Sequence, residues 1–311
     1  MNHCPSCQNH NINVLEKIMT SKLVWLYKRM SINTSDLFRN IESLDYCECN
    51  SCKLRYFDPV VSGDNDFYGQ LQSMEWYYLH DNKTEYEFSS KLIKPTDKVL
   101  DVGSGRGVFA SHITCAFYQG LDTSTKAIEL AKKDGRNVIG ETIERHAAKF
   151  KNYYDVVVAF QVLEHVSNVN VFFRCCVDSL KNGGHFIIAV PNNDSFLQYA
   201  TNNALDIPPH HQLHWNERSL KFIANKYSLE VVSVYKEQVT NIHKQSYLTT
   251  MIMNKLRRIF NMKYKIVDNS IRYRILCKFA SILAKVFRKR PLLNSTGQTI
   301  IIVLKKPMQS A

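Results

Sequence analysis

The chain has 311 residues, 45% of them hydrophobic, and a formal net charge of +12 at pH 7. No apolar run reaches the roughly 18 residues that cross a bilayer, and the start of the chain lacks the basic and apolar regions of a signal peptide, so we expect a cytoplasmic protein. The length permits one large core with a small additional module. The excess of positive charge lies almost entirely between Met251 and Asn294, a segment with twelve Lys and Arg residues and one Asp.

Two Cys-x-x-Cys pairs stand in the first 52 residues, and 41 residues separate them. Each pair can place two thiolates on one face of a turn, and four thiolates suit structural, tetrahedral Zn²⁺ better than disulfides in a reducing compartment. The candidate ligands are Cys4, Cys7, Cys49 and Cys52. Cys47 is a spare thiol, and the long separation predicts a hairpin or short helix near residues 23–27. We expect a zinc ribbon over residues 1–62.

An aromatic-rich segment follows, with rings at mixed helical spacing. We assign residues 63–95 to a helical linker that packs the zinc ribbon onto the main domain. In the alternative interpretation, some of these rings form a lid over a bound ligand. The residues are Phe67, Tyr68, Trp76, Tyr77, Tyr78, Tyr86 and Phe88.

Strands and helices then alternate regularly over residues 96–311. The pattern predicts strands over residues 98–102, 117–121, 137–139, 154–160, 185–190, 229–235 and 298–304. It predicts helices over residues 108–116, 123–133, 168–180 and 217–226, the last capped by Asn216. Such alternation implies parallel strands with right-handed crossovers, and hence an α/β, Rossmann-like fold.

A glycine-rich turn follows the first of these strands, in the stretch Val99-Leu-Asp-Val-Gly-Ser-Gly-Arg-Gly107. Its glycines let the backbone turn sharply and approach a ligand closely. Position 108 is Val, so the third glycine comes one residue earlier than in the dinucleotide-binding Gly-x-Gly-x-x-Gly motif. The candidate ligand-binding residues here are Asp101, Gly103, Ser104, Gly105 and Gly107.

Further candidates follow the next strands, because open parallel sheets bind ligands beyond the carboxyl ends of their strands. Asp122 stands about twenty residues past the turn, where a carboxylate accepts both ribose hydroxyls, and it can also cap the helix that follows. The remaining candidates are Thr123 beside it, Glu141 and Thr142 at the expected adenine edge, and Phe160 and Gln161 after the fourth strand.

The Gly-x-Gly-x-Gly turn resembles motif I of class I S-adenosylmethionine (SAM) methyltransferases. Together with Asp122 and the stretches Glu141-Thr-Ile-Glu-Arg-His-Ala-Ala-Lys149 and Val162-Leu-Glu-His-Val166, it makes residues 97–192 resemble the ubiquinone-pathway O-methyltransferases and their wider relatives. The resemblance implies SAM as the cofactor. It also implies the methyltransferase sheet of seven strands, with the last strand antiparallel beside the sixth.

The loop after the fourth strand departs from that family. The ubiquinone-pathway enzymes have Glu-x-x-Glu-His there, a trio implicated in divalent-metal binding in some members, whereas this chain has Gln161 in the first position and keeps Glu164 and His165. An amide is a poorer ligand for hard metals than a carboxylate, so we do not extend that metal site to this chain. His165 stays a candidate base near the transferred methyl group, or else supports the loop under the cofactor.

A histidine-rich loop, Pro208-Pro-His-His-Gln-Leu-His-Trp215, follows the fifth strand. O-methylation needs a base for the hydroxyl proton, and His has a suitable pKa. We expect His211 and His214 as acceptor-site bases and Trp215 as a stacking face for a sugar ring; loop-stabilising hydrogen bonds are the alternative role. A histidine metal site is not expected, because no paired carboxylates stand near this loop in the sequence.

The order of Cys-x-x-Cys pairs, aromatic helical segment and methyltransferase domain resembles bacterial enzymes that modify sugars or glycans, often alongside polysaccharide biosynthesis. We therefore predict O-methylation of a sugar or glycan precursor. Alternatives are O-methylation of a polyprenylated aromatic quinone precursor, a zinc-ribbon protein that binds or methylates nucleic acid, and a non-catalytic scaffold. Nucleic acid is disfavoured, because the region up to Cys52 is not markedly basic and no Asn/Asp-Pro-Pro-Tyr or Phe motif follows the fourth strand.

A basic helical insertion is expected over residues 240–296, before the last strand. Its apolar residues fall at helical spacing with Lys and Arg between them. Residues 251–290 can lie on an anionic membrane surface, reach a lipid- or nucleotide-linked sugar acceptor, contact a partner, or form a solvated outer face. A peripheral position at the inner membrane surface therefore stays open.

Overall fold

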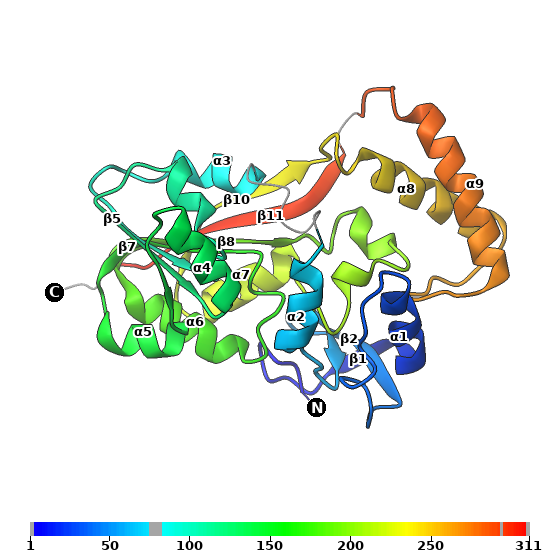
Figure 1. The fold of residues 1–311 in the computed structure, drawn as a ribbon, viewed down its shortest axis with the longest axis horizontal. Coiled ribbons are helices and arrows are strands. Elements are labelled where there is room, and N and C mark those ends of the chain that lie inside the picture. Colours follow the sequence, from blue (N-terminus) through cyan, green and yellow to red (C-terminus); the bar gives the residue numbers. More distant parts are fainter. Residues whose placement is uncertain (1–2, 75–82, 293–294, 309–311) are drawn as a thin grey trace.

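The computed structural model describes residues 3–74, 83–292 and 295–308. Two sheets lie side by side in it, and a pair of long helices projects from one end of the molecule (Figure 1). The larger sheet has seven strands in the order β10-β11-β8-β7-β4-β5-β6, and the smaller sheet has four in the order β1-β2-β3-β9.

The larger sheet has the predicted Rossmann-like topology. Its strands are β4 (Lys98–Val102), β5 (Phe117–Asp122), β6 (Val138–Gly140), β7 (Tyr154–Phe160), β8 (Leu180–Pro191), β10 (Glu230–Gln238) and β11 (Thr296–Lys305). Strands β4 to β8 run parallel, and β11 lies antiparallel between β8 and β10. The seven-stranded sheet with its last strand antiparallel beside the sixth is therefore confirmed.

Helices cover both faces of this sheet. They are α3 (Thr84–Ser90), α4 (Thr125–Lys133), α5 (Ile143–Lys149), α6 (Val169–Ser179) and α7 (Glu217–Lys226). Along β7, Val157 packs in one cluster with α6 and α7, whereas its neighbours Val156 and Val158 pack in another with Tyr86 of α3. The nearly continuous Val and Ile runs of the strands follow from this burial on two sides.

Most predicted helices are confirmed, but the one expected over residues 108–116 is wrong. Only a 3-10 turn, Val108–His112, forms there, because the chain is already extended at Ile113 on its way into β5. The predicted cap of α7 is present as a capping box: the Asn216 side chain accepts a hydrogen bond from the Ser219 backbone, and the Ser219 hydroxyl accepts one from the Asn216 backbone.

The smaller sheet contains strands from two distant parts of the chain, the N-terminal module and the histidine loop. Its strands are β1 (Ile12–Met19), β2 (Ser43–Cys49), β3 (Arg55–Asp58) and β9 (Leu213–His214), with α1 (Thr20–Lys28) between β1 and β2. Helix α1 confirms the element predicted near residues 23–27. Strand β9 comes from the histidine loop and pairs antiparallel with β3, Arg55 opposite His214 and Tyr56 opposite Leu213. The N-terminal module and the main domain thus share a sheet.

The basic insertion forms two helices, α8 (Lys244–Ile259) and α9 (Ile271–Phe287), between β10 and β11. They pack against each other and are the pair that projects in Figure 1. Across the described ranges, no helix combines the length and the apolar character needed to cross a membrane.

Candidate functional site

The glycine turn lies between β4 and the 3-10 turn, and all three glycines have positive φ: 71° at Gly103, 56° at Gly105 and 70° at Gly107. A Cβ at Gly103 would lie 2.4 Å from Val162 Cγ2, and one at Gly107 would lie 2.7 Å from Val138 Cγ2, whereas one at Gly105 would meet no atom within 4 Å. Gly105 therefore presents bare backbone to open space, as a ligand-binding turn requires.

This open space is a cavity of about 610 Å³, which we call the turn cavity. It is lined by Gly103, Gly105, Asp122, Thr123 and Gln161 from the predicted set, and by residues of α2 (Asn65–Gln72) and the start of α4. Backbone amides hold the Asp122 carboxylate in place: Gly105 N–H donates to Oδ2 at 2.7 Å and Ser124 N–H donates to Oδ1 at 2.8 Å. The carboxylate is thus oriented at the carboxyl end of β5.

Some predicted binding residues lie away from this cavity. Asp101 is buried behind the turn, where Tyr118 donates a hydrogen bond to it at 2.7 Å and burial raises the pKa of its carboxyl to about 7. The Glu141 carboxylate is engaged by His146 at 2.8 Å and by Lys149 at 2.6 Å. Helix α5 begins at Ile143, and its residues His146 and Lys149 are the ones that contact Glu141. Neither Glu141 nor Thr142 is among the described residues that line the turn cavity.

A second cavity of about 580 Å³ adjoins the first, and we call it the histidine cavity. The two share Gly103, Gly105, Gln161 and His165. Ser104 and Phe160, both predicted binding residues, line the histidine cavity instead of the turn cavity. A ligand in each cavity would therefore meet the other beside Gln161 and His165.

Three histidines converge on the histidine cavity with defined orientations. The Nδ1 atom of His165 donates to the His210 carbonyl at 2.7 Å, and that of His210 donates to the Leu205 carbonyl at 2.8 Å. His211 places its Nδ1 atom 3.1 Å from an Asp206 carboxylate oxygen. Since each Nδ1 faces an acceptor, Nε2 is the unprotonated nitrogen of each neutral ring.

Glu164 lies beside these rings and is 1% exposed. Its Oε1 atom is 4.0 Å from His165 Nε2 and 3.9 Å from His211 Nε2, and neither carboxylate oxygen has a hydrogen-bond partner among the described residues. Burial raises the pKa of Glu164 to about 8 and lowers that of His165 to about 4. Burial also lowers the pKa values of His210 and His211 well below the ordinary value.

Hydrogen-bond acceptors thus outnumber donors among the side chains of His165, His210, His211 and Glu164. One nitrogen each of His165, His210 and His211 lies within 4.8 Å of the others, a set that could hold a divalent ion or take the proton of a bound hydroxyl. The sequence shows no paired carboxylates beside the histidine loop, but the fold places Glu164 next to His211, which Asp206 also contacts.

The matching family model is described as Methyltransferase domain and covers residues 74–234, more than half of the chain. The chain belongs to this family. Its glycine turn, Asp122 and Rossmann-like sheet are those of class I SAM-dependent methyltransferases, as the sequence predicts.

Curated relatives of this methyltransferase include two ubiquinone biosynthesis O-methyltransferases. The protein of Escherichia coli O127:H6 is 36% identical over 105 residues, which are 31% of this chain and 44% of that protein. The protein of Proteus mirabilis is 26% identical over 173 residues, which are 53% and 66% of the two chains. The chain thus spans less than half the length of the first relative. A SAM-dependent methyltransferase structure from Archaeoglobus fulgidus has a TM-score of 0.47 at 20% identity, covering 71% of this chain and 92% of that one.

Two residues predicted for the acceptor site of the methyltransferase, Trp215 and His214, are not among those that line the histidine cavity. Trp215 is 0% exposed and its indole N–H donates to the Leu163 carbonyl at 3.2 Å, so the expected stacking on a sugar ring is wrong. His214 is buried, with Nδ1 at 2.8 Å from the Tyr46 hydroxyl and Nε2 at 2.7 Å from the Asp206 carbonyl. Strand β9 places His214 in the smaller sheet, and Trp215 follows it into the hydrophobic core. His214 therefore has a structural role and is not placed to act as a base.

Sequence reasoning missed Asp206 and His210 as members of the site. Asp206 is buried, contacts His211 at 3.1 Å and His214 at 3.6 Å, and lines the histidine cavity. Its position five residues before His211 was an available signal, because a carboxylate commonly orients a functional histidine. His210 stands in the predicted loop but was passed over for its neighbours.

The described residues of the aromatic segment divide between packing positions and cavity walls, and the lid stays a prediction. Phe67 is buried and Phe88 stacks on Tyr235 at 4.9 Å between ring centroids, so these rings pack the modules together. Tyr68 lines the turn cavity with its hydroxyl 3.3 Å from His165 Nδ1, and Tyr86 lines the histidine cavity. The remaining aromatic candidates, Trp76, Tyr77 and Tyr78, lie outside the described residues.

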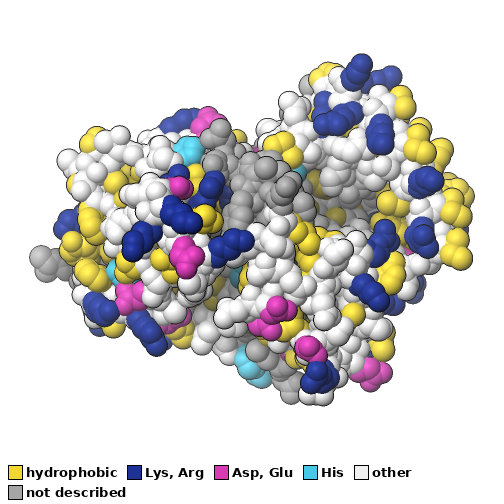
Figure 2. Space-filling view, in the orientation of Figure 1, with side chains coloured by type: hydrophobic (Ala, Val, Ile, Leu, Met, Phe, Trp, Pro, Cys, Tyr) yellow, Lys and Arg dark blue, Asp and Glu magenta, His cyan; other side chains and the backbone are white. Residues whose placement is uncertain are grey.

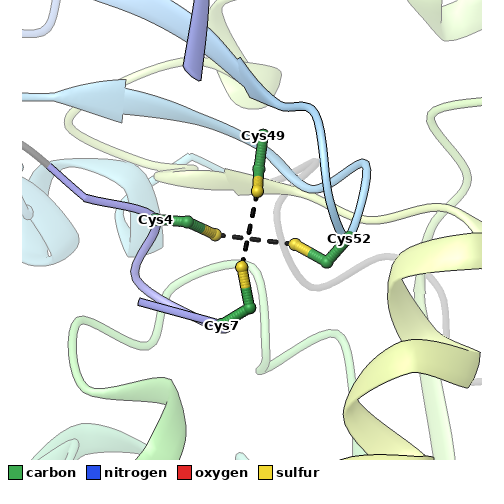
Figure 3. Close-up of side chains that lie close together, drawn as sticks. All are labelled: Cys4, Cys7, Cys49 and Cys52. Atoms are coloured by element: carbon green, nitrogen blue, oxygen red, sulfur yellow. Dashed lines mark hydrogen bonds between the residues drawn. The ribbon is translucent and has the colours of Figure 1, made fainter. Parts of the chain in front are cut away.

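The four predicted zinc ligands meet at one point (Figure 3). Sγ of Cys4 lies 3.5 Å from that of Cys52, and Sγ of Cys7 lies 3.4 Å from that of Cys49, far beyond the roughly 2.05 Å of a disulfide. The two turns repeat one geometry: Gln8 N–H donates to the Cys4 carbonyl and Lys53 N–H to the Cys49 carbonyl, each at 2.9 Å, and both donors have positive φ. Cys47 is not part of the cluster; its thiol faces the Asp45 carbonyl.

Proposed function

We propose that this protein transfers a methyl group from SAM to a hydroxyl oxygen of a sugar or glycan precursor. The observation that carries the proposal is the junction of the two cavities at Gln161 and His165. When bound, SAM supplies an electrophilic methyl group on a sulfonium. In the turn cavity, the Gly105 backbone leaves room for it and the Asp122 carboxylate would accept the ribose hydroxyls.

His165 is the proposed base, because it is the one histidine that lines both cavities among the described residues. The His210 carbonyl holds its Nδ1–H, which leaves Nε2 to accept the hydroxyl proton as the oxygen attacks. Burial keeps this ring neutral at pH 7, since it lowers the pKa of His165 to about 4. His211, oriented by Asp206, would bind a neighbouring hydroxyl of the acceptor.

The lining of the histidine cavity favours a sugar over a prenylated aromatic acceptor. Most of its side chains are polar and can hydrogen-bond several hydroxyl groups. They include Arg106, Asn203, Asp206, His243, Ser246 and Gln298. A polyprenylated phenol is the second candidate, because the curated relatives named above are ubiquinone biosynthesis O-methyltransferases.

We also propose that the cysteine cluster binds one Zn²⁺. Four thiols at these separations fit tetrahedral coordination and leave no open position, so the ion would be structural. Cys4, Cys49 and Cys52 lie in the hydrophobic core that the main domain shares. The ion would therefore stabilise the contact between the N-terminal module and the domain that holds both cavities.

The acceptor is tested by incubating the purified protein and SAM with nucleotide-linked sugars, lipid-linked sugars or polyprenylated phenols. Release of S-adenosylhomocysteine and a mass gain of one methylene in the acceptor report the reaction. We expect turnover with a sugar and a His165→Gln variant slowed by about 10²–10⁴-fold at unchanged SAM affinity. His185→Gln, which changes a histidine of β8 that lies opposite Val156 of β7, should retain full activity. Turnover of the phenol alone would refute the sugar assignment.

A further inference from the structure

Helix α9 carries a stripe of large apolar side chains that face solvent. The exposed fractions are 73% for Ile271, 64% for Ile275, 50% for Phe279, 54% for Ile282 and 69% for Val286. These five residues, which we call the α9 stripe, follow one another at intervals of three or four and so lie on one side of the helix. No segment of the described chain covers them.

The opposite side of α9 anchors it to the protein. Tyr273, Ala280 and Ala284 are buried, and the first two pack in one cluster with Met253 of α8. Gln245 of α8 donates a hydrogen bond to the Ser281 carbonyl at 3.1 Å. The α9 stripe therefore points away from the body of the molecule as a consequence of how the helix packs.

Basic side chains border the stripe. Arg272, Arg274, Lys278 and Lys285 are exposed on α9, and Arg288, Lys289 and Arg290 follow its end. Neither α8 nor α9 contains an acidic residue, and Asp268, between the two helices, is 7% exposed with Oδ1 accepting from the Ser270 amide. Figure 2 shows apolar and basic side chains alternating over the projecting end of the molecule.

We propose that α9 docks this protein on the surface of an anionic membrane, with the α9 stripe at the boundary between head groups and acyl chains. A helix with one apolar side and Lys and Arg at its border is the form that lies in a membrane interface, where anionic lipids attract the cations. A second copy of the chain would bring like charges together at the same patch. Nucleic acid would pair with the cations but would leave the apolar stripe in water.

The helix pair is fixed firmly enough for docking to orient the rest of the molecule. Arg257 of α8 is 4% exposed, and its guanidinium donates to the Tyr199 carbonyl at 3.1 Å. Near the start of α8, His243 and Ser246 line the histidine cavity. Docking through α9 would thus hold that cavity at a set position relative to the membrane, where an acceptor carried on a lipid is within reach. The docking itself does not depend on the proposed reaction.

Sedimentation with vesicles tests the proposal on the full chain. We expect the protein to pellet with vesicles of phosphatidylcholine and phosphatidylglycerol and to stay in solution with phosphatidylcholine alone, with weaker binding at higher salt. The variant Ile275→Ser/Phe279→Ser/Ile282→Ser removes the centre of the stripe, and Arg274→Glu/Lys278→Glu/Lys285→Glu reverses its border. Each should weaken binding at least about tenfold while the protein stays folded, because the changed side chains are exposed.

Control variants make the same kinds of change, charge reversal and replacement of exposed apolar side chains by Ser, elsewhere on the protein. Lys94→Glu/Lys133→Glu/Lys151→Glu reverses three exposed lysines outside the insertion, and Val14→Ser/Val232→Ser replaces two apolar side chains that are 54% and 50% exposed. Both controls should bind vesicles like the unmodified protein. The proposal is overturned if the protein ignores anionic vesicles, if the stripe variant binds them equally well, if the stripe instead forms a dimer seen by analytical ultracentrifugation, or if the protein binds RNA but no vesicle.

Discussion

The Nε2 atom of His211 lies 3.9 Å from the Oε1 atom of Glu164, although the two residues follow different strands of the larger sheet. Both groups are buried and each is a hydrogen-bond acceptor when Glu164 is ionised. Burial therefore favours the protonated, neutral form of Glu164, consistent with a pKa raised to about 8. This pairing links the stability of the protein to pH.

We expect the contribution of Glu164 to the free energy of unfolding to fall as pH rises. Its folded-state pKa of about 8 exceeds the unfolded value of about 4.3, so folding takes up a proton between about pH 4.3 and pH 8. The stabilisation is fully present below about pH 4.3 and is lost as the pH rises through about 8. The free energy of unfolding of the unmodified protein, relative to Glu164→Gln, should fall by up to about 1.4 kcal/mol per pH unit in this window. Urea unfolding from pH 5 to pH 8 measures it; two parallel curves would contradict the expectation.

Substitution of the first two glycines of the turn should separate stability from ligand binding. Gly103→Ala would place Cβ 2.4 Å from Val162, whereas Gly105→Ala would meet no atom within 4 Å, and both positions have positive φ. We expect Gly103→Ala to lower the free energy of unfolding by about 1–3 kcal/mol more than Gly105→Ala. Thermal unfolding gives the comparison, and Gly105→Ala should still lose SAM affinity by calorimetry, because its methyl group enters the turn cavity.

Asp122 should contribute directly to SAM binding. Asp122→Ala removes the carboxylate that the Gly105 and Ser124 amides orient at the turn cavity, and we expect at least a tenfold weaker Kd, or about 1.4 kcal/mol. Asp134→Asn, at the far end of α4, is the control and should bind SAM normally. Isothermal titration calorimetry measures both, and an unchanged Kd for Asp122→Ala would rule out the ribose-binding role.

Cys47 and Cys49 give a matched pair for the zinc proposal. Both are buried on β2, but only Cys49 belongs to the cysteine cluster. Cys49→Ser should lose Zn²⁺, measured by plasma emission spectroscopy, and lower Tm markedly, because three thiolates and a hydroxyl bind the ion poorly. Cys47→Ser should keep one Zn²⁺ per chain. Equal zinc content in the two variants would place the ion elsewhere.

Local patterns of the sequence were sufficient for the larger sheet and for the pairs of cysteines. The Val run of β7, the Asn216 cap and the glycines before Val108 each depend on neighbours a few residues away, so their structures could be predicted. The 3-10 turn in place of a helix at residues 108–116 could not, because the path of the chain into β5 decides where that turn ends.

By itself, the sequence determined that the chain has a class I methyltransferase sheet, a glycine turn with Asp122 behind it and four cysteines at metal-ligand spacing. Only the tertiary structure decided which histidines face the cavity. Pairing of β9 with β3 turns His214 and Trp215 inward, while Asp206 and Glu164 come to His211 from outside the histidine loop. The β3–β9 pairing and the Glu164–His211 contact join residues far apart in the chain, and helical or strand periodicity carries no information about which distant segments pair.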